Sequence, residues 1–295
     1  MDVKEYIAKE TNVRGEWKSA SEISTFKGGG KAFVIYPESV EKATKTIGVL
    51  RSEKVDFSML GKGSNTLVSD GECKQVLVSF KHINDVKIEG NFAVCEGGAS
   101  VRKVVELGRK AGRGGLEFLS GVPCSVGGAL KMNAGAFSSK IEDYVSKLYI
   151  LNIDCANCDG ICIEEKSAKD IDFGYRKGVG GIVLKAVLRL YPKTVEQSIV
   201  EAKLFLSQRR AKQPVLPSLG SVFKNGETAS GKLIDLCGLK GLKIGGAQVS
   251  QKHANFIVNT GGATASDYLD LANFCKKAVF EKTGITLEEE FKLVD

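Results

Sequence analysis

Two segments of the chain combine glycine with serine and asparagine in a way that could hold a charged ligand. The first glycine segment, residues 61–65, follows the apolar run 57–60, and the second glycine segment spans residues 121–136. Glycine lets the backbone turn its N–H groups toward an anion and lets a ligand approach the main chain closely. We therefore expect the two segments to bind a pyrophosphate, which makes a large nucleotide cofactor the first hypothesis.

Two common nucleotide-binding motifs are matched only in part. Residues 226–232 fit the G-x-x-x-x-G-K pattern, but Leu233 stands where a P-loop needs serine or threonine for magnesium, so these residues are interpreted as a turn that opens a helix. Gly61 and Gly63 lack the third glycine of the Rossmann fingerprint, and residues 67–71 predict a strand and a turn rather than a helix. Neither a kinase or ATPase nor a Rossmann domain is expected.

Three cysteines close together in the sequence, Cys155, Cys158 and Cys162, suggest a zinc or redox site. A structural zinc site needs four ligands, usually in two pairs, and both histidines, His82 and His253, are remote in sequence. The cysteine segment also fits a polar hairpin turn. We therefore expect no metal ion, and a metal or redox function stays open as an alternative.

The bulk composition narrows the class of protein. With 295 residues, 43% hydrophobic and 26% charged, the chain is typical of a soluble globular protein of two domains or three small ones. Its net charge of +7 suits an anionic small molecule, and the only basic cluster, residues 209–212, argues against nucleic acid as a partner. No apolar run has signal-peptide character or the ~18 residues that span a bilayer. We expect a cytoplasmic protein without membrane association, whose cysteines are reduced thiols.

Hydrophobic periodicity and glycine or proline breaks predict alternating strands and helices. Strands are expected over residues 32–36, 57–60, 76–79, 86–88, 92–95, 147–153, 161–163, 181–190, 247–249, 256–258 and 286–292. Helices are expected over residues 40–50, 101–111, 195–210, 229–237 and 266–282. The first strand, helix and strand form a small βαβ-like unit. A domain boundary is placed near residues 195–200, and a weaker one near residue 80.

Polar residues at three places in the chain are harder to explain as ordinary surface residues. Tyr175 and Arg176 lie in a turn-rich connection before a strand, Ser221 follows a proline-rich hinge, and Glu290 ends an acidic run in the closing strand. Taken singly, each fits a surface residue. Sequence spacing alone does not group them into a site.

A series of motifs runs in order along most of the chain. They are TFKGGG at 25–30, GKGSN at 61–65, GLEF at 115–118, GVP at 121–123, GGA at 127–129, MNAGA at 132–136, YR at 175–176, GSVFKN at 220–225 and GGAQVS at 245–250. From about residue 20 to 293 the sequence resembles the UDP-N-acetylenolpyruvoylglucosamine reductases, flavin enzymes of peptidoglycan precursor synthesis. The short connection from Phe223 to Gly245 resembles the form of this family that lacks a tyrosine-bearing loop.

The resemblance implies an α+β fold. Two FAD-binding subdomains of the PCMH or vanillyl-alcohol-oxidase type are expected at residues 1–80 and 81–195, followed by an α+β substrate-binding domain at residues 196–295. It also implies that NADPH reduces FAD and that UDP-N-acetylglucosamine enolpyruvate then binds. A hydride passes to the β-carbon of the enolpyruvyl group and a proton to the α-carbon, which gives UDP-N-acetylmuramate.

Three catalytic residues follow from the family pattern. Arg176 is expected to stabilise the enolate-like charge, since a guanidinium pairs with a carboxylate through two hydrogen bonds. Ser221 is expected to donate the proton to the α-carbon, and Glu290 to complete the network at the carboxylate. Glu288 and Glu289 lie next to it in the sequence and stay open as alternatives to Glu290.

The remaining site residues implied by the resemblance fall into two groups. Cofactor contacts are expected from Gly61, Gly63, Ser64, Asn65, Gly121, Ser125, Gly128, Asn133 and Gly135. Contacts to the UDP-sugar are expected from Tyr175, Arg209, Lys212, Gln213, Lys224 and Asn225. The protein is expected to act as a monomer on this small-molecule substrate.

Two residues depart from the family pattern. Cys124 stands where glycine is usual, and a positive φ at that position would strain a cysteine. Gly178 replaces a usual hydroxyl-bearing residue two positions after Arg176.

Two other functions stay open as alternatives. One is another FAD-dependent oxidoreductase with the same cofactor fold, and the other is a non-catalytic nucleotide-binding or redox-sensing protein.

Overall fold

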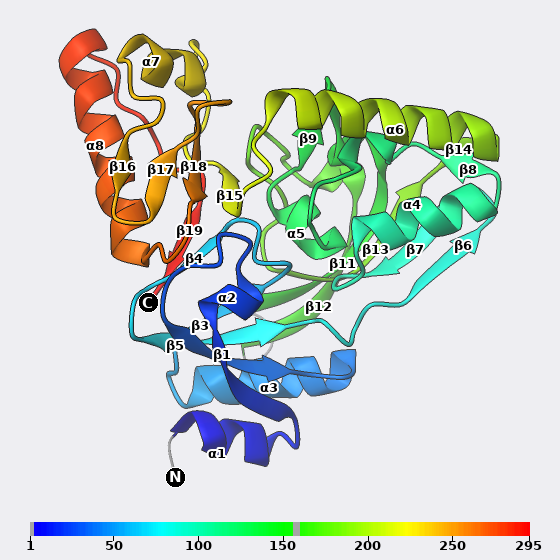
Figure 1. Ribbon diagram of the computed structural model, residues 1–295. Coiled ribbons are helices and arrows are strands. Elements are labelled where there is room, and N and C mark those ends of the chain that lie inside the picture. Colours follow the sequence, from blue (N-terminus) through cyan, green and yellow to red (C-terminus); the bar gives the residue numbers. More distant parts are fainter. Residues whose placement is uncertain (1–2, 156–159) are drawn as a thin grey trace. The chain divides into compact units, whose positions relative to one another are not determined.

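The computed structural model describes residues 3–155 and 160–295 as an α+β protein (Figure 1). The chain divides into two compact units, each built from separated segments. Unit 1 contains Met1–Gly15, Ile35–Val55 and Val78–Arg209, and unit 2 contains Glu16–Val34, Asp56–Leu77 and Arg210–Asp295. These units do not coincide with the three consecutive domains expected at 1–80, 81–195 and 196–295, and that division stays a prediction.

Unit 1 is organised around a five-stranded antiparallel sheet. The strand order is β12-β11-β13-β7-β6, with β6 Val86–Glu89, β7 Phe92–Glu96, β11 Val145–Cys155, β12 Gly160–Ser167 and β13 Ile182–Arg189. Side chains of the sheet and of helices α4 (Val101–Lys110) and α5 (Val126–Lys131) form one apolar core that includes Val104, Leu130 and Leu148. The strands expected at residues 147–153 and 161–163 lie within β11 and β12, which pair with each other.

Unit 2 contains a second antiparallel sheet with two helices. The strand order is β15-β18-β17-β16, with β15 Ser218–Ser221, β16 Lys243–Ile244, β17 Ala247–Val249 and β18 Phe256–Asn259. Helices α7 (Ser230–Leu236) and α8 (Ala265–Thr283) supply core residues, and Tyr268 of α8 contacts the ring of Phe26 edge-on at 4.9 Å. Thr264 caps α8 by accepting a hydrogen bond from the Asp267 N–H, which satisfies a helix-end donor.

The closing strand is shorter and later than the sequence suggests. β19 covers Lys292–Val294 and pairs in parallel with β4, Thr66–Val68, so the expected strand at 286–292 is wrong in its extent. Residues 288–290 instead make separate backbone hydrogen bonds with residues 222–224. Three acidic side chains in a row have no alternation of apolar residues, and their position is set by the partner segment.

The N-terminal part of the chain holds a four-stranded sheet in the order β1-β2-β5-β3. Its strands are β1 Arg14–Ser19, β2 Lys31–Tyr36, β3 Phe57–Leu60 and β5 Glu72–Ser79. β2 and β3 flank β5, so the expected βαβ-like unit exists in sequence, but its two strands are not neighbours. The remaining elements include α1 (Val3–Glu10), α2 (Ala20–Ile23), α3 (Val40–Ser52) and α6 (Val195–Lys212). No helix within the described ranges is long and apolar enough to cross a membrane.

Candidate active site

In unit 2, Ser221 and Glu290 lie on neighbouring stretches of backbone. Ser221 is the last residue of β15 and pairs with Phe256 of β18. The Glu290 N–H donates to the Val222 carbonyl oxygen at 2.8 Å. The fold therefore brings together two candidate catalytic residues that the sequence could not group.

The structure also distinguishes the three glutamates of the acidic run. Glu288 is exposed and forms an ion pair with Lys224, and Glu289 accepts a hydrogen bond from Lys276 Nζ at 2.6 Å. Burial alone would raise the pKa of Glu289, but the bond from Lys276 outweighs it and the pKa is lowered. Glu290 is half-buried and has a buried carboxylate oxygen, Oε2. Glu290 thus differs from its two neighbours in its surroundings, and its catalytic role stays a prediction.

Asn65 of the first glycine segment holds the backbone of Glu290. Its Nδ2 donates to the Glu290 carbonyl oxygen at 2.9 Å, and the Lys292 N–H donates to the Asn65 carbonyl oxygen at 2.8 Å. β4 and β19 continue this contact along the chain. Asn65 thus supports the candidate site through a contact that no local sequence signal predicts, and its expected cofactor contact stays a prediction.

The rest of the first glycine segment forms a tight turn. Gly63 has φ +65°, and a Cβ there would lie 1.8 Å from the Ile23 carbonyl oxygen. Its own carbonyl oxygen accepts a hydrogen bond from the Thr25 N–H at 3.0 Å. The packing of the protein itself therefore requires this glycine, in addition to any ligand. Gly61 and Ser64 lie in the same turn, and their cofactor contacts stay predictions.

The second glycine segment belongs to unit 1 and begins α5. Ser125 caps this helix by accepting from the Gly128 N–H at 3.2 Å. The Gly127 N–H donates to the Gly97 carbonyl oxygen at 2.8 Å, and a Cβ on Gly127 would lie only 3.0 Å from that oxygen. Gly127, Gly128 and Gly135 are all partly exposed. This segment fits a cofactor that approaches the backbone.

Asn133, near the end of the second glycine segment, makes hydrogen bonds within the protein. It is buried with φ +43°, a conformation that asparagine tolerates better than most residues. Its Nδ2 donates to the Glu142 carboxylate at 2.6 Å and to the Gly174 carbonyl oxygen at 3.0 Å. The side-chain amide is therefore engaged within the protein, and its expected cofactor contact stays a prediction.

Arg176 occupies the tip of a tight turn. Gly174 and Lys177 exchange backbone hydrogen bonds of 2.8 and 3.1 Å, which leaves Tyr175 and Arg176 as the two central residues. Arg176 has φ +56°, and its guanidinium lies over the Tyr175 ring at 5.4 Å from the centroid. Tyr175 is exposed and Arg176 is half-buried. The turn presents a cation and an aromatic ring together.

Cys124 is not strained. Its φ lies outside the left-handed region, whereas Gly121 has φ +83°, so cysteine replaces glycine at a position that tolerates a side chain. Burial raises the pKa of the Cys124 thiol to about 12, and the nearby charge of Arg209 opposes this only weakly. Cys124 is therefore a neutral thiol at pH 7.

Arg209 supports the chain just before the second glycine segment. Its guanidinium donates to the carbonyl oxygens of Phe118 (3.4 Å) and Ser120 (3.3 Å) and lies over the Phe137 ring at 5.5 Å. Burial lowers the pKa of Arg209, although the group stays charged. These contacts give Arg209 a structural role, and its contact with substrate stays a prediction.

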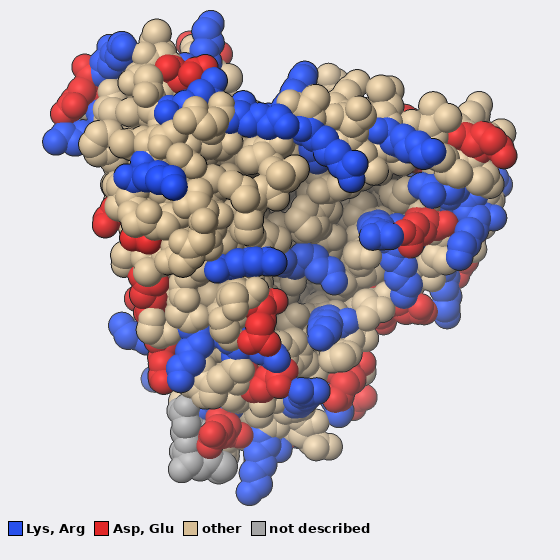
Figure 2. Space-filling model, in the orientation of Figure 1, with Lys and Arg blue, Asp and Glu red and all other residues tan. Residues whose placement is uncertain are grey.

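The other expected substrate residues lie in unit 2. Lys212 is exposed, Gln213 is half-buried, and Asn225 accepts a hydrogen bond from the Ser230 N–H at 3.0 Å at the start of α7. Lys224 pairs with Glu288. Figure 2 shows lysine and arginine side chains spread over the visible face with acidic side chains between them. Substrate contacts of all these residues stay predictions.

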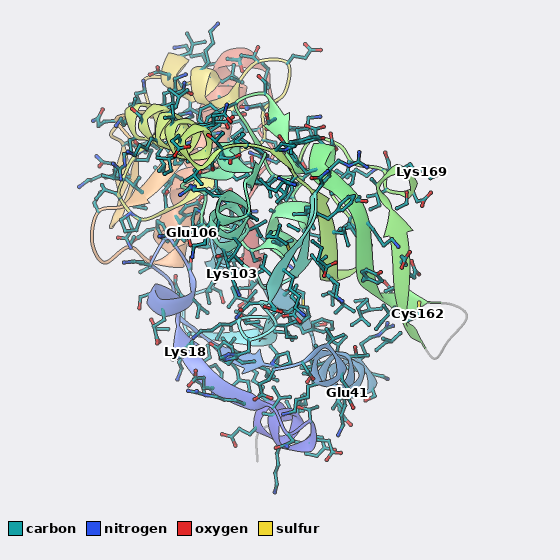
Figure 3. The ribbon with its side chains drawn as sticks, turned by 90° about the vertical axis from the view of Figure 1, so that its right-hand side faces the viewer. Lys18, Glu41, Lys103, Glu106, Cys162 and Lys169 are labelled. Carbon is teal, nitrogen blue, oxygen red and sulfur yellow. The ribbon has the colours of Figure 1, made fainter. Side chains whose placement is uncertain are left out.

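Of the three clustered cysteines, the structure describes only the side chain of Cys162. Cys162, near the start of β12 (Figure 3), lies with its Sγ 3.6 Å from a Glu164 carboxylate oxygen. Cys158 lies outside the described residues, and nothing is said of the Cys155 side chain. Within residues 3–155 and 160–295, no three His, Cys, Asp or Glu side chains are grouped to hold a metal ion. His253 accepts from the Asn255 N–H through Nδ1, which fits a structural side chain.

Both halves of the chain match known family models. Residues 31–164 match the FAD binding domain, and residues 211–294 match the C-terminal domain of UDP-N-acetylenolpyruvoylglucosamine reductase. Proteins with that name from Pelobacter propionicus and Geobacter metallireducens are 39% and 40% identical to the chain over 274 residues. The alignments cover 90% of this chain in each case, and 90% and 89% of the relatives. The chain belongs to the UDP-N-acetylenolpyruvoylglucosamine reductase family.

Solved structures agree with this assignment. The crystal structure of UDP-N-acetylenolpyruvylglucosamine reductase from Thermus caldophilus is 30% identical, with a TM-score of 0.80, and the match covers 96% of this chain and 100% of that one. Xylooligosaccharide oxidase from Myceliophthora thermophila C1 matches 65% of this chain and 43% of its own, at 15% identity and a TM-score of 0.50, which supports the fold alone. The expected fold class and the expected FAD cofactor of this family member are confirmed.

Proposed function

We propose that this reductase family member converts UDP-N-acetylglucosamine enolpyruvate to UDP-N-acetylmuramate in peptidoglycan precursor synthesis, with NADPH as the reductant. The names of the relatives, their coverage of nearly the whole chain and the two family models support this reaction. One NADPH and one proton are consumed for each double bond reduced. The substrate gains a hydride at the β-carbon and a proton at the α-carbon.

The residues present fit FAD. The partly exposed main chain at Gly127, Gly128 and Gly135 suits a pyrophosphate. Bound FAD would accept the hydride of NADPH and later pass it to the substrate. The protein itself orients the ligands, stabilises the negative charge that develops on the substrate and donates the proton.

Charge develops on the substrate carboxylate and α-carbon as the hydride arrives. We assign its stabilisation to Arg176, because a guanidinium can pair with a carboxylate through two hydrogen bonds. Ser221 is assigned as the donor whose Oγ–H delivers the proton to the α-carbon. Glu290 is assigned to complete the polar network at the substrate carboxylate. Solvent returns a proton to Ser221 after the step.

One observation carries this assignment of roles. The Glu290 N–H bonds to the Val222 carbonyl oxygen at 2.8 Å, which keeps the glutamate beside the end of the Ser221 strand. Glu288 and Glu289 have lysine partners instead. This backbone bond places the two residues on adjacent stretches of chain, which supports assigning them to one proton-delivery step.

Stopped-flow absorbance of the flavin tests the function in its two halves. The wild-type protein with FAD should be reduced by NADPH and then reoxidised by UDP-N-acetylglucosamine enolpyruvate. Ser221→Ala should leave reduction fast and slow reoxidation by about 10²–10⁴-fold. Equal slowing of both halves would contradict the role of Ser221. Purified protein that binds no FAD would refute every flavin-dependent function, including the alternative of another oxidoreductase.

We also propose that the enzyme acts as a monomer in the cytoplasm. The match to relatives over 90% of the chain and the net charge of +7 agree with an enzyme that acts on an anionic nucleotide-sugar. Light scattering coupled to size-exclusion chromatography measures the mass of the particle. A mass near 31.6 kDa is expected, and a stable dimer would contradict the proposal.

A further inference from the structure

The turn that carries Arg176 is held in an unfavourable backbone conformation. Among the described residues, most of those with positive φ are glycines, yet Arg176 has φ +56° at the third position of the turn 174–177. A residue other than glycine, asparagine or aspartate rarely adopts this region. Such conformations persist only where surrounding contacts over-determine them, and they are concentrated at functional sites. The contacts that hold this turn therefore control where the guanidinium lies.

The second glycine segment supplies one of these contacts through a buried amide. Asn133 Nδ2 bridges the Glu142 carboxylate (2.6 Å) and the Gly174 carbonyl oxygen (3.0 Å), and its Oδ1 accepts from the Glu142 N–H (3.4 Å). Asn133 itself is buried, and its partners Glu142 and Gly174 are partly exposed. Gly174 begins the turn, so this amide fixes one end of it.

The other side of the turn rests directly on the end of α5. The Val179 N–H approaches the Leu130 carbonyl oxygen at 3.4 Å. A Cβ at Gly178 would lie 1.8 Å from that oxygen and 2.6 Å from the Lys131 carbonyl oxygen, so no side chain fits here without a backbone shift. Gly178 is the position where the family usually has a hydroxyl. In this chain, the absence of a side chain at Gly178 lets the turn approach α5 closely.

We propose that Asn133 and Gly178 are positioning residues that set the place of the Arg176 guanidinium for the reduction step. This inference rests on the proposed function and on the role assigned to Arg176. The second glycine segment would then have two roles. Its glycine backbone would bind the cofactor, and its Asn133 would hold the turn that carries Arg176. Neither Asn133 nor Gly178 needs to touch the substrate.

Three variants test this inference in the FAD-bound enzyme. Gly178→Ala introduces the clashing Cβ, and Asn133→Asp keeps a residue that tolerates positive φ but removes the Nδ2 donor and faces the Glu142 carboxylate. Gly180→Ala is the matched control, because a Cβ there meets nothing within 4 Å and its φ is not in the left-handed region. All three are followed by stopped-flow in both half-reactions.

The expected result separates a positioning role from general damage. Gly178→Ala and Asn133→Asp should retain flavin reduction by NADPH, while reoxidation by the enolpyruvyl substrate falls on the order of 10- to 100-fold, the scale of a small misplacement of a reacting group. Gly180→Ala should match the wild type. In the Arg176→Lys background, Gly178→Ala should cause little further loss, because the guanidinium it positions is already gone.

Several outcomes would overturn the inference. Wild-type reoxidation rates in both variants would do so, and so would equal slowing of both half-reactions or full additivity with Arg176→Lys. If Asn133→Asp fails to retain FAD, Gly178→Ala alone decides, since its clash involves only the ends of α5 and the turn. A wild-type enzyme that the enolpyruvyl substrate does not reoxidise would instead refute the proposed function.

Discussion

Replacing Glu117 with glutamine should lower the free energy of unfolding by about 2–3 kcal/mol at pH 7. The side chain of Glu117 is 1% exposed, and its carboxylate accepts hydrogen bonds from the Gly115 N–H at 2.6 Å and Ser198 Oγ at 2.7 Å. Lys193 Nζ lies 3.2 Å from the same carboxylate. The buried charge therefore joins the chain near residue 115 to the start of α6.

The magnitude follows from these contacts. Hydrogen bonds to a charged group contribute about 1.5–3 kcal/mol and neutral ones about 0.5–1.5, so loss of the charge weakens each of the two shortest bonds by about 1 kcal/mol. The NH₂ group of glutamine is itself a donor, so it would face either the Gly115 N–H or the Ser198 hydroxyl, which donate to the carboxylate in the wild type. Lys193 keeps its second partner, Glu201, and is 20% exposed. The loss therefore stays below the 3–5 kcal/mol expected when a buried charge is left unpaired.

The same carboxylate predicts a dependence on pH. Burial alone would raise the pKa of Glu117, but the bonds from Ser198 and Gly115 outweigh it and lower the pKa. A lowered folded-state pKa stabilises the protein above the unfolded value, near 4.3, and this contribution is lost as the pH falls through the folded value. The wild type and Glu117→Gln should therefore approach each other in stability below about pH 4.

Urea denaturation followed by circular dichroism, at one fixed FAD concentration, measures this difference. Glu106→Gln is the control, because Glu106 is an exposed member of an i,i+4 pair with Arg102 and should change stability by less than about 0.5 kcal/mol. A loss for Glu117→Gln no larger than that of the control at pH 7 would refute the reasoning, as would a difference that does not shrink with acid.

Three further outcomes are expected. Tyr268→Phe should leave the melting temperature unchanged or raise it, because its hydroxyl is buried without a hydrogen-bond partner among the described residues; a clear fall would contradict this. Asp70→Ala should lower stability by about 1 kcal/mol in urea denaturation, because Asp70 accepts hydrogen bonds from the Ala265 and Ser266 N–H groups at the start of α8. Glu290→Gln should slow flavin reoxidation while Glu288→Gln leaves it unchanged, and equal rates would contradict the choice of Glu290.

The sequence predicts the elements whose side chains alternate strongly. The helices at α3, α4, α6 and α8 and the strands of the five-stranded sheet lie where periodicity indicates them. β15 was not expected, because Ser218–Ser221 contains two serines and a glycine and no apolar alternation. α5 was not expected either, since two of its six residues are glycine. Both are held by distant partners, which periodicity does not report.

In the candidate site, too, contacts between residues far apart in the sequence could not be predicted. The family motifs identify Arg176, Ser221 and Glu290, but not the residues that support them. Asn65 and Asn133 look like cofactor ligands in the sequence, and in the structure their amides bond to the Glu290 and Gly174 backbones. A side chain that bonds to a distant main-chain carbonyl has no local signature. The folded chain therefore shows contacts of these asparagines that the sequence does not, while their cofactor contacts stay predictions.

The contact between the first glycine segment and the closing strand has a consequence for synthesis of the protein. Asn65 and Glu290 are 225 positions apart, so at about 5–20 residues per second the ribosome needs roughly 10–45 s to supply the partner of Asn65. Until then β4 lacks its parallel neighbour, and unit 2 stays incomplete with apolar residues such as Leu67 uncovered. A nascent chain that stops before Glu290 therefore lacks both the candidate catalytic carboxylate and the partner of Asn65.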